Sequence, residues 1–154
     1  MSDLVLSDHF RSGGVAVLSD HILESFDIKK THIGHGEAFA VYFAFTHEIR
    51  NLARADVLWF IDNLGVLSAL CKGSSKSLDL GCITYGSLLL TAAHDILLWW
   101  DHVESAANCA DGGSRQCDRI ARRLGVVLKD RALPHWPAMP RSTLPFEWLQ
   151  LISG

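Results

Sequence analysis

The chain has 154 residues, of which 49% are hydrophobic and 20% are charged, and its formal net charge is −3. This length and composition exclude a disordered or fibrous protein and predict one domain, with room for an appendage. The charge is uneven, because residues 1–71 hold nine acids and five bases, whereas residues 115–141 hold seven bases and two acids. Either chance or a binding site for a polyanion explains that gradient, so the negative total does not exclude nucleic acid.

The first part of the chain predicts strands. Two of them are short apolar runs, and a third alternates between apolar and polar residues and is expected to run antiparallel to the second. A turn with two glycines at residues 11–14 separates the first two. The three strands cover residues 4–6, 15–18 and 22–28. A long helix over residues 37–53 follows, with phenylalanine and alanine at helical spacing.

The second part alternates between strands and helices. Residues 56–61 are apolar after the first residue, which indicates a central strand buried on both faces. The later expected elements are a short helix through Leu70, a loop over 72–77, a helix over 78–93, a strand over 96–100, and a helix within 108–124 that ends at Gly125. This order predicts an α/β fold with a five-stranded mixed sheet, three antiparallel strands followed by parallel strands, flanked by helices.

The C-terminal end differs in composition from the rest. All four prolines lie beyond Leu133, and the same segment contains Trp136 and Trp148. We therefore expect a folded domain over residues 1–124 and an arm over residues 125–154 that lies outside the main fold.

Four acids stand at special points of these elements. Asp8 ends the first strand, Asp62 ends the central strand, Glu37 opens the long helix, and Asp111 lies near the start of the last helix. Each acid alone is most simply a solvated or capping residue. If the first and the central strand are neighbours, however, the four carboxylates converge and repel one another unless cations are bound. Carboxylate oxygens are suitable ligands for Mg²⁺ or Mn²⁺, and in nucleases two such ions bind the oxygens of the phosphate that is cleaved.

The motifs around these acids resemble the ribonuclease H domain of reverse-transcribing retroelements, over about residues 4–124. The matching pieces are LVLSD with GGVAVL, GEAFAVYFAF, VLWFIDNLGVLSALCKGSS and HVESAANCADGGSR. Family members have a strand ending in Ser/Thr-Asp, a helix opening with Glu and an Ala three residues later (here Ala40), a strand ending in Asp-Asn or Asp-Ser, and Asn-x-x-Asp-x-x-Ser-Arg. The four acids occur in this order, separated by 29, 25 and 49 residues.

The resemblance implies a ribonuclease H-like fold and two-metal hydrolysis of the RNA strand of an RNA–DNA hybrid. Asp8 would bridge two Mg²⁺ or Mn²⁺ ions, and Glu37 and Asp62 would help to hold the ion that activates the attacking water. Asp111 would bind the ion that stabilises the leaving 3′ oxygen. The chain would then be part of, or derived from, a reverse transcriptase.

Recognition of the hybrid requires groups that reach 2′-hydroxyls and phosphates. The candidates for 2′-hydroxyl contacts are the backbone at Gly13 and Glu37 and the side chains of Ser12, Asn63, Ser74 and Ser75. The candidates for phosphate contacts are Lys72, Lys76, Arg115 and Arg119, for which a solvated surface is an equally good explanation.

The sequence departs from the family in three places. Many members have a histidine in the loop before the last acid, but residues 104–107 have none, and His102, which lies earlier, is expected to be structural. Glu104-Ser105 stands where Pro-Gly or Pro-Ser is usual. No basic helical protrusion lies between Lys72 and Leu78, so affinity for the hybrid is expected to depend on an adjoining domain.

Other readings remain open. His32 and His35 with Cys109 or Cys117 could form a zinc site, although zinc sites favour more than one close pair of ligands. A Ser-His-Asp or Cys-His hydrolase is a further alternative, but the sequence has no nucleophile motif such as GxSxG. Trp99 and Trp100 could stack bases, but at least one is expected in the core. The main rival is a non-catalytic domain whose arm, residues 133–152, docks on a partner protein.

The sequence shows no pattern typical of a membrane span, a signal peptide or a disulfide framework. The longest uncharged stretch, residues 80–93, is shorter than the roughly 20 residues that span a bilayer, and the first ten residues lack the pattern of a signal peptide. Cys71, Cys82, Cys109 and Cys117 have irregular spacing, which predicts free thiols in a reducing compartment. We therefore expect an intracellular protein, in cytoplasm or nucleus, without a membrane span.

Overall fold

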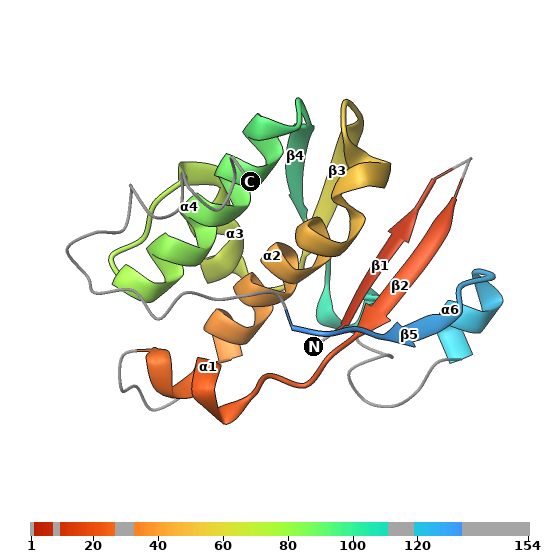
Figure 1. Ribbon diagram of the computed structural model, residues 1–154, viewed down its shortest axis with the longest axis horizontal. Helices are drawn as coiled ribbons and strands as arrows, with labels where there is room; N and C mark the ends of the chain where they lie inside the picture. The colour runs from red at the N-terminus through yellow and green to blue at the C-terminus, as the bar shows by residue number, and fades with distance from the viewer. Residues whose placement is uncertain (1, 8–9, 27–32, 111–118, 134–154) are drawn as a thin grey trace.

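The computed structural model describes residues 2–7, 10–26, 33–110 and 119–133 (Figure 1). Its elements in chain order are β1 (Ser2–Leu6), β2 (Arg11–Val15), α1 (Asp20–Ser25), α2 (Ile33–Leu52), β3 (Asp56–Ile61), α3 (Leu64–Lys72), α4 (Leu78–Ala93), β4 (Leu97–His102), the 3-10 helix η1 (Ser105–Ala107), α6 (Arg119–Arg123) and β5 (Leu128–Asp130). None of the helices in these ranges has the length and apolar character needed to cross a membrane.

The described strands form two sheets. In the first, β2 pairs antiparallel with β1 and parallel with β5. In the second, β3 and β4 pair in parallel, from Asp56 opposite Leu97 to Ile61 opposite His102. Figure 1 shows the two sheets as separate groups, with β1 and β2 beside each other on the right and β3 and β4 near the centre. The mixed α/β class is confirmed, but the single five-stranded sheet is not what the described residues form.

The first strands differ from the sequence prediction. The expected turn at residues 11–14 is β2, and a hydrogen bond of 2.9 Å from the Ser7 N–H to the Phe10 carbonyl closes the chain before it. The glycines belong to the strand because β2 lies between β1 and β5. A Cβ on Gly13 would lie 2.8 Å from side-chain atoms of both Leu4 and Leu128, so a larger residue would require these side chains to shift.

The expected third strand, residues 22–28, is also different. Residues Asp20–Ser25 form α1, while residues 27 and 28 lie outside the described residues. Ile22 and Phe26 are four residues apart and each is 5% exposed. This spacing buries both side chains on one side of a helix, whereas the alternation in the sequence suggested a strand.

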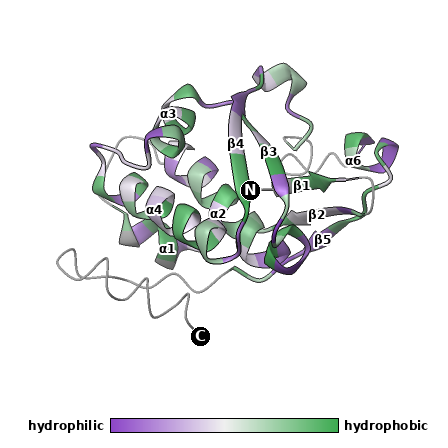
Figure 2. Ribbon diagram, turned by 90° about the horizontal axis from the view of Figure 1, so that it is seen from above, coloured by the Kyte–Doolittle hydropathy of each residue, from purple (hydrophilic) through white to green (hydrophobic). Residues whose placement is uncertain are grey.

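Helix α2 is the centre of the core. Its Phe39, Phe43 and Phe45 are fully buried, which agrees with the apolar surface expected for this helix. The ring of Phe45 lies 4.9 Å from that of Trp59 on β3 and 6.4 Å from that of Trp100 on β4. Figure 2 shows α1, α2 and α4 on the same side of β3 and β4. The second sheet is therefore covered by these helices on one face.

Strand β3 has the expected bounds but not the expected burial. Its side chains alternate, with Leu58 56% exposed and Phe60 52% exposed, while Ile61 is buried. The prediction of a strand buried on both faces was wrong, because only the face of Val57, Trp59 and Ile61 meets the core.

The chain returns to the fold after α6. Gly125 has a φ of +72°, and the Val126 N–H donates to the Ala121 carbonyl at 2.8 Å, which confirms the predicted helix end at this glycine. In the predicted range, residues 108–124, the described α-helix is α6, and residues 111–118 lie outside the described residues. Residues of the expected arm then form β5, which pairs with β2, and Leu133 packs against the core. Residues 128–130 therefore belong to the sheet, and residues 134–154 lie outside the described residues; a division into two units stays a prediction.

A buried carboxylate joins the first sheet to α2. Glu48 is 4% exposed and forms an ion pair with Arg131. It also accepts hydrogen bonds from the Ser12 hydroxyl at 2.5 Å and from Asn51 Nδ2 at 2.8 Å. Burial alone would raise the pKa of Glu48, but the hydrogen bonds from Ser12, Asn51 and Arg131 and the charge of Arg131 outweigh it, so the pKa lies below its usual value.

We expect Arg131→Ala to destabilise the fold by about 3–5 kcal/mol, because it leaves the Glu48 carboxylate buried without its cation. Lys129→Ala, at an exposed position of β5, is the matched control and should change the free energy of unfolding by less than about 0.5 kcal/mol. Urea denaturation measures both; equal effects would contradict the role given to this ion pair.

The lowered pKa of Glu48 also predicts a pH dependence. The pKa of a glutamate in the unfolded chain is about 4.3. The ionised network therefore contributes fully to the stability of the fold above that pH, and this contribution is lost as the pH falls through the lower pKa of Glu48 in the folded state. The difference in unfolding free energy between the wild type and Glu48→Gln should therefore be largest near neutral pH and shrink below pH ~4. A constant difference over this range would refute the assignment.

Candidate functional site

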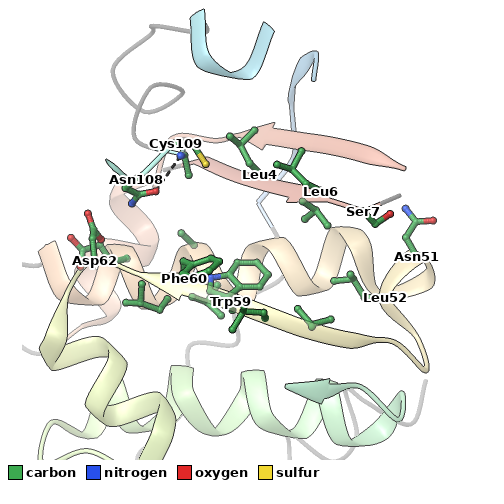
Figure 3. Close-up of a pocket in the computed structure, with 18 of the residues that line it drawn as sticks. Leu4, Leu6, Ser7, Asn51, Leu52, Trp59, Phe60, Asp62, Asn108 and Cys109 are labelled. Atoms are coloured by element: carbon green, nitrogen blue, oxygen red, sulfur yellow. Dashed lines mark hydrogen bonds between the residues drawn. The ribbon is translucent and has the colours of Figure 1, made fainter. Parts of the chain in front are cut away.

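A cavity of about 770 Å³ lies between β1 and β3, each of which is the edge strand of its sheet. Figure 3 shows Leu4 and Leu6 of β1 on one side and Trp59 and Phe60 of β3 on the other. Side chains of α2, among them Ala40, also line it. The volume falls in the range of about 300–1,000 Å³ that is typical of ligand pockets.

Two of the four predicted acids line this cavity, at the same end. Asp62 follows β3, and Glu37 lies in the first turns of α2. These ends of the two elements are close, because a Cβ on Gly34 would lie 3.8 Å from Asn63 Nδ2 and Glu37 follows Gly34 by one helical turn. Glu37 and Asp62 therefore line the same end of the cavity.

The segment before Asp111 reaches the same end. In Figure 3, Asn108 and Cys109 lie beside Asp62, and these residues and Ala110 line the cavity. The Asn108 Oδ1 accepts a hydrogen bond of 3.1 Å from the Ala110 N–H, which fixes the backbone here. Asp111 itself lies outside the described residues, but the residue before it belongs to the Asp62 end.

The opposite end of the cavity holds the end of β1. Figure 3 places Ser7 beside Asn51 and away from Asp62. Asn51 follows Glu37 by 14 residues of α2, which corresponds to about 20 Å along the helix axis. Two further observations agree: the hydroxyl of Ser12, early in β2, donates to Glu48 near the C-terminal end of α2, whereas Leu18, after β2, lies near Gly36.

The structure does not pair β1 with β3: the two strands belong to different sheets, and β1 ends near the start of β3. Asp8 and Asp111 lie outside the described residues, so the convergence of the four carboxylates stays a prediction. Within the described ranges there is no group of three or more His, Cys, Asp and Glu side chains that could hold a metal ion.

Two predicted RNA contacts lie away from the cavity. Ser12 donates to Glu48 and accepts from Arg131 Nη2 at 2.7 Å, so its hydroxyl belongs to the buried network. Gly13 is buried and pairs with Leu4 on one side and Leu128 on the other. Their positions in β2 therefore do not suit contacts with a 2′-hydroxyl, which corrects that expectation.

Most of the other predicted RNA contacts lie at the two ends of α3 or in the loop that follows it. Asn63 is the N-cap of this helix, and its Oδ1 accepts from the N–H groups of Gly65 at 2.9 Å and Val66 at 3.2 Å. Lys72, Ser74 and Lys76 are exposed at the other end of α3, and the half-buried Ser75 accepts a hydrogen bond from the Ser77 N–H. Arg119 is exposed on α6, and Arg115 lies outside the described residues.

The histidines and cysteines of the zinc alternative are spread out. His35 is 6% exposed, its Nε2 lies 3.2 Å from the Ser77 hydroxyl, and its ring lies against Phe26. Cys109 lines the cavity, where His35 does not. Cys71, Cys82 and Cys109 are free, as predicted, while His32 and Cys117 lie outside the described residues.

His102 and the tryptophan pair occupy β4. His102 is its half-buried last residue, opposite Ile61 of β3. Trp100 packs against Phe45, whereas Trp99 is 55% exposed, so one tryptophan of the pair is in the core, as expected.

Comparison with known proteins finds no match, whether to protein-family models, to curated proteins or to solved structures. The relation to ribonuclease H domains therefore rests on the motifs of the sequence alone.

Sequence reasoning missed several residues of the cavity and its supports. Asn108 was part of a recognised motif, but Trp59, Phe60 and Asn51 carried no functional signal. Glu48 and Arg131 were not singled out, because nothing local marks a pair that lies 83 residues apart. Such a pair becomes visible only when the chain is folded.

The capping role of Asn63 predicts how this position tolerates change. Asn63→Ala should lower the free energy of unfolding by about 1 kcal/mol, because two N–H groups of α3 lose their acceptor. Asn63→Asp keeps an acceptor of similar strength and should stay close to the wild type. Urea denaturation of both variants tests this, with Ser68→Ala inside α3 as the control; equal losses for Ala and Asp would contradict the cap.

Proposed function

We propose that this chain is a metal-dependent ribonuclease H with an RNase H-like fold, which hydrolyses the RNA strand of RNA–DNA hybrids and derives from, or forms part of, a retroelement reverse transcriptase. One observation carries the proposal: Glu37 and Asp62, which lie far apart in the sequence, line the same end of one cavity. The segment that leads to Asp111 lines that end as well.

The donor atoms at this end fit Mg²⁺ or Mn²⁺. Two carboxylates and the amide of Asn108 offer oxygen atoms, which are the ligands that hard divalent ions prefer. Glu37 and Asp62 would hold the ions, and Asp111 would add a third carboxylate. When bound, two such ions supply positive charge for the phosphate and an activated water for in-line attack.

Asp8 lies outside the described residues, as does Asp111. In this proposal Asp8 would help to hold both ions, and mutation tests that role.

The surface next to Asp62 suits a nucleic-acid strand. Asn63 adjoins the site, and α3 leads away from it to the exposed Lys72 and Lys76. The nine residues of α3 span about 13 Å, which corresponds to about four nucleotides of a strand. The lysines are thus placed for phosphates several nucleotides from the cleaved bond, while an adjoining polymerase domain would supply further affinity.

We expect Asp62→Asn to abolish Mg²⁺-dependent cleavage of RNA in a hybrid, because the amide removes a charged metal ligand. Asp56→Asn is the matched control: Asp56 begins the same strand and lines the same cavity, but lies at its other end. It should retain activity. A labelled hybrid assayed with and without chelator measures both, and circular dichroism verifies folding.

Asp8→Asn completes the design. Loss of activity would show that Asp8 is a ligand; retained activity would leave three acids as the ligand set. Equal activity of the wild type and Asp62→Asn would overturn the proposed site. No metal-dependent cleavage by the wild type would favour the non-catalytic domain, and cleavage of duplex DNA would indicate a different nuclease of the same fold class.

A further inference from the structure

The outer face of the β3–β4 sheet is apolar and faces away from the helices. Leu58 and Phe60 of β3 and Leu97 and Trp99 of β4 are 52–60% exposed. The register places Leu58 directly opposite Trp99, so these side chains are neighbours on one surface. We call these four residues the outer patch. Much of β3 and β4 is correspondingly hydrophobic in Figure 2.

The outer patch is unlike the other exposed apolar residues. Val17 and Val127 are more exposed, at 84% and 77%, but they lie far apart in the sequence, one after β2 and one before β5. Four large contiguous apolar side chains, by contrast, are a surface that soluble proteins rarely leave bare. We therefore expect the outer patch to be covered in the protein.

The charges beside the outer patch limit which kind of partner can cover it. Asp56 stands opposite Leu97 and Asp101 stands opposite Phe60, and both acids are exposed on the same face. A nucleic-acid strand stacked on Trp99 would bring its phosphates against these carboxylates. A second copy laid face to face would also bring acids together. An apolar segment with little negative charge is the better partner.

The chain itself holds such a segment. Residues 142–154 include one charged residue, Glu147, and are rich in large apolar side chains: Leu144, Phe146, Trp148, Leu149, Leu151 and Ile152. The described chain ends at Leu133, where the Ala132 carbonyl contacts His47 Nε2 of α2 at 2.8 Å. Phe45 of α2 packs against Trp59 of the second sheet, and two residues later His47 points to another side of the helix. The described chain therefore ends on a side of α2 that does not face the second sheet.

The path from this end to the outer patch has a suitable length. Measured straight across one helix and one sheet layer it is about 20 Å, and a path around these layers is longer. Residues 134–141 contain three prolines and, in an extended conformation of about 3.1 Å per residue, span about 25 Å. They exceed the straight-line distance, and the first residues of 142–154 add to the reach.

We propose that residues 142–154 cover the outer patch, so that the C-terminal segment is an intramolecular third layer on the β3–β4 sheet. Leu58 and Phe60 also line the cavity, but the inference is argued from the exposure of the outer patch and not from the proposed nuclease activity. The covering segment shields Leu58, Phe60, Leu97 and Trp99, while residues 134–141 connect it to the core.

Limited proteolysis of the full chain with chymotrypsin tests the proposal. The readout is the rate of cleavage after Phe146 and Trp148, followed by mass spectrometry. Trp99→Glu and Leu58→Glu place a charge in the outer patch and should accelerate cleavage by about tenfold or more, because cleavage follows the population of the open form. Val17→Glu is the matched control at an exposed apolar site elsewhere and should cleave like the wild type.

Two further measurements complete the test. Trp99→Ser is the milder variant if Trp99→Glu fails to fold, and cleavage at the buried Phe39 and Phe43 reports unfolding in every sample. Light scattering over a range of concentrations measures the oligomeric state. Equal cleavage rates in the wild type and the patch variants would overturn the proposal. A dimer that the patch variants abolish would also overturn it, in favour of a second copy on this face.

Discussion

The buried ion pair between Glu48 and Arg131 ties the described fold together. Glu48 comes from the central helix, Arg131 from the end of the last described strand, and Ser12, which bonds to both, from β2. A buried carboxylate is tolerated only when its charge and its hydrogen bonds are satisfied, so these three elements must meet at one point. The position of β2 along α2 follows from that meeting, and β1, hydrogen-bonded to β2, follows with it.

This constraint decides which end of the cavity each strand reaches. Because Ser12 is held near the C-terminal end of α2, the adjacent end of β1 is there too, with Ser7 beside Asn51. Glu37 and Asp62 lie at the N-terminal end of the same helix. The network that stabilises the first sheet is therefore also the reason that two of the proposed metal ligands meet while Ser7 stays apart.

The second sheet shows a different balance. Its inner face packs Trp59 and Trp100 around Phe45, while its outer face presents Leu58 and Trp99 to solvent. A two-stranded sheet with apolar side chains on both faces is stable only when both are covered. The helices cover one face, and the proposed C-terminal layer covers the other. The cavity and the outer patch share Leu58 and Phe60 of β3, whereas Leu97 and Trp99 of β4 belong to the outer patch alone.

The sequence by itself determined the elements whose signals are local. The bounds of β3 and α4, the helix end at Gly125 and the acid after β3 were predicted correctly, because caps, periodicity and apolar runs act within a few residues. The start of α2 was not, since the helix begins at Ile33 and Glu37 is its fifth residue. Only the tertiary structure decided that Arg11–Val15 is a strand, that β3 is buried on one face, that the strands form two sheets and that Glu48 meets Arg131. These outcomes depend on contacts between distant segments, such as the pairing of Gly13 with Leu128. The free energy of such contacts cannot be predicted from the residues of either segment alone.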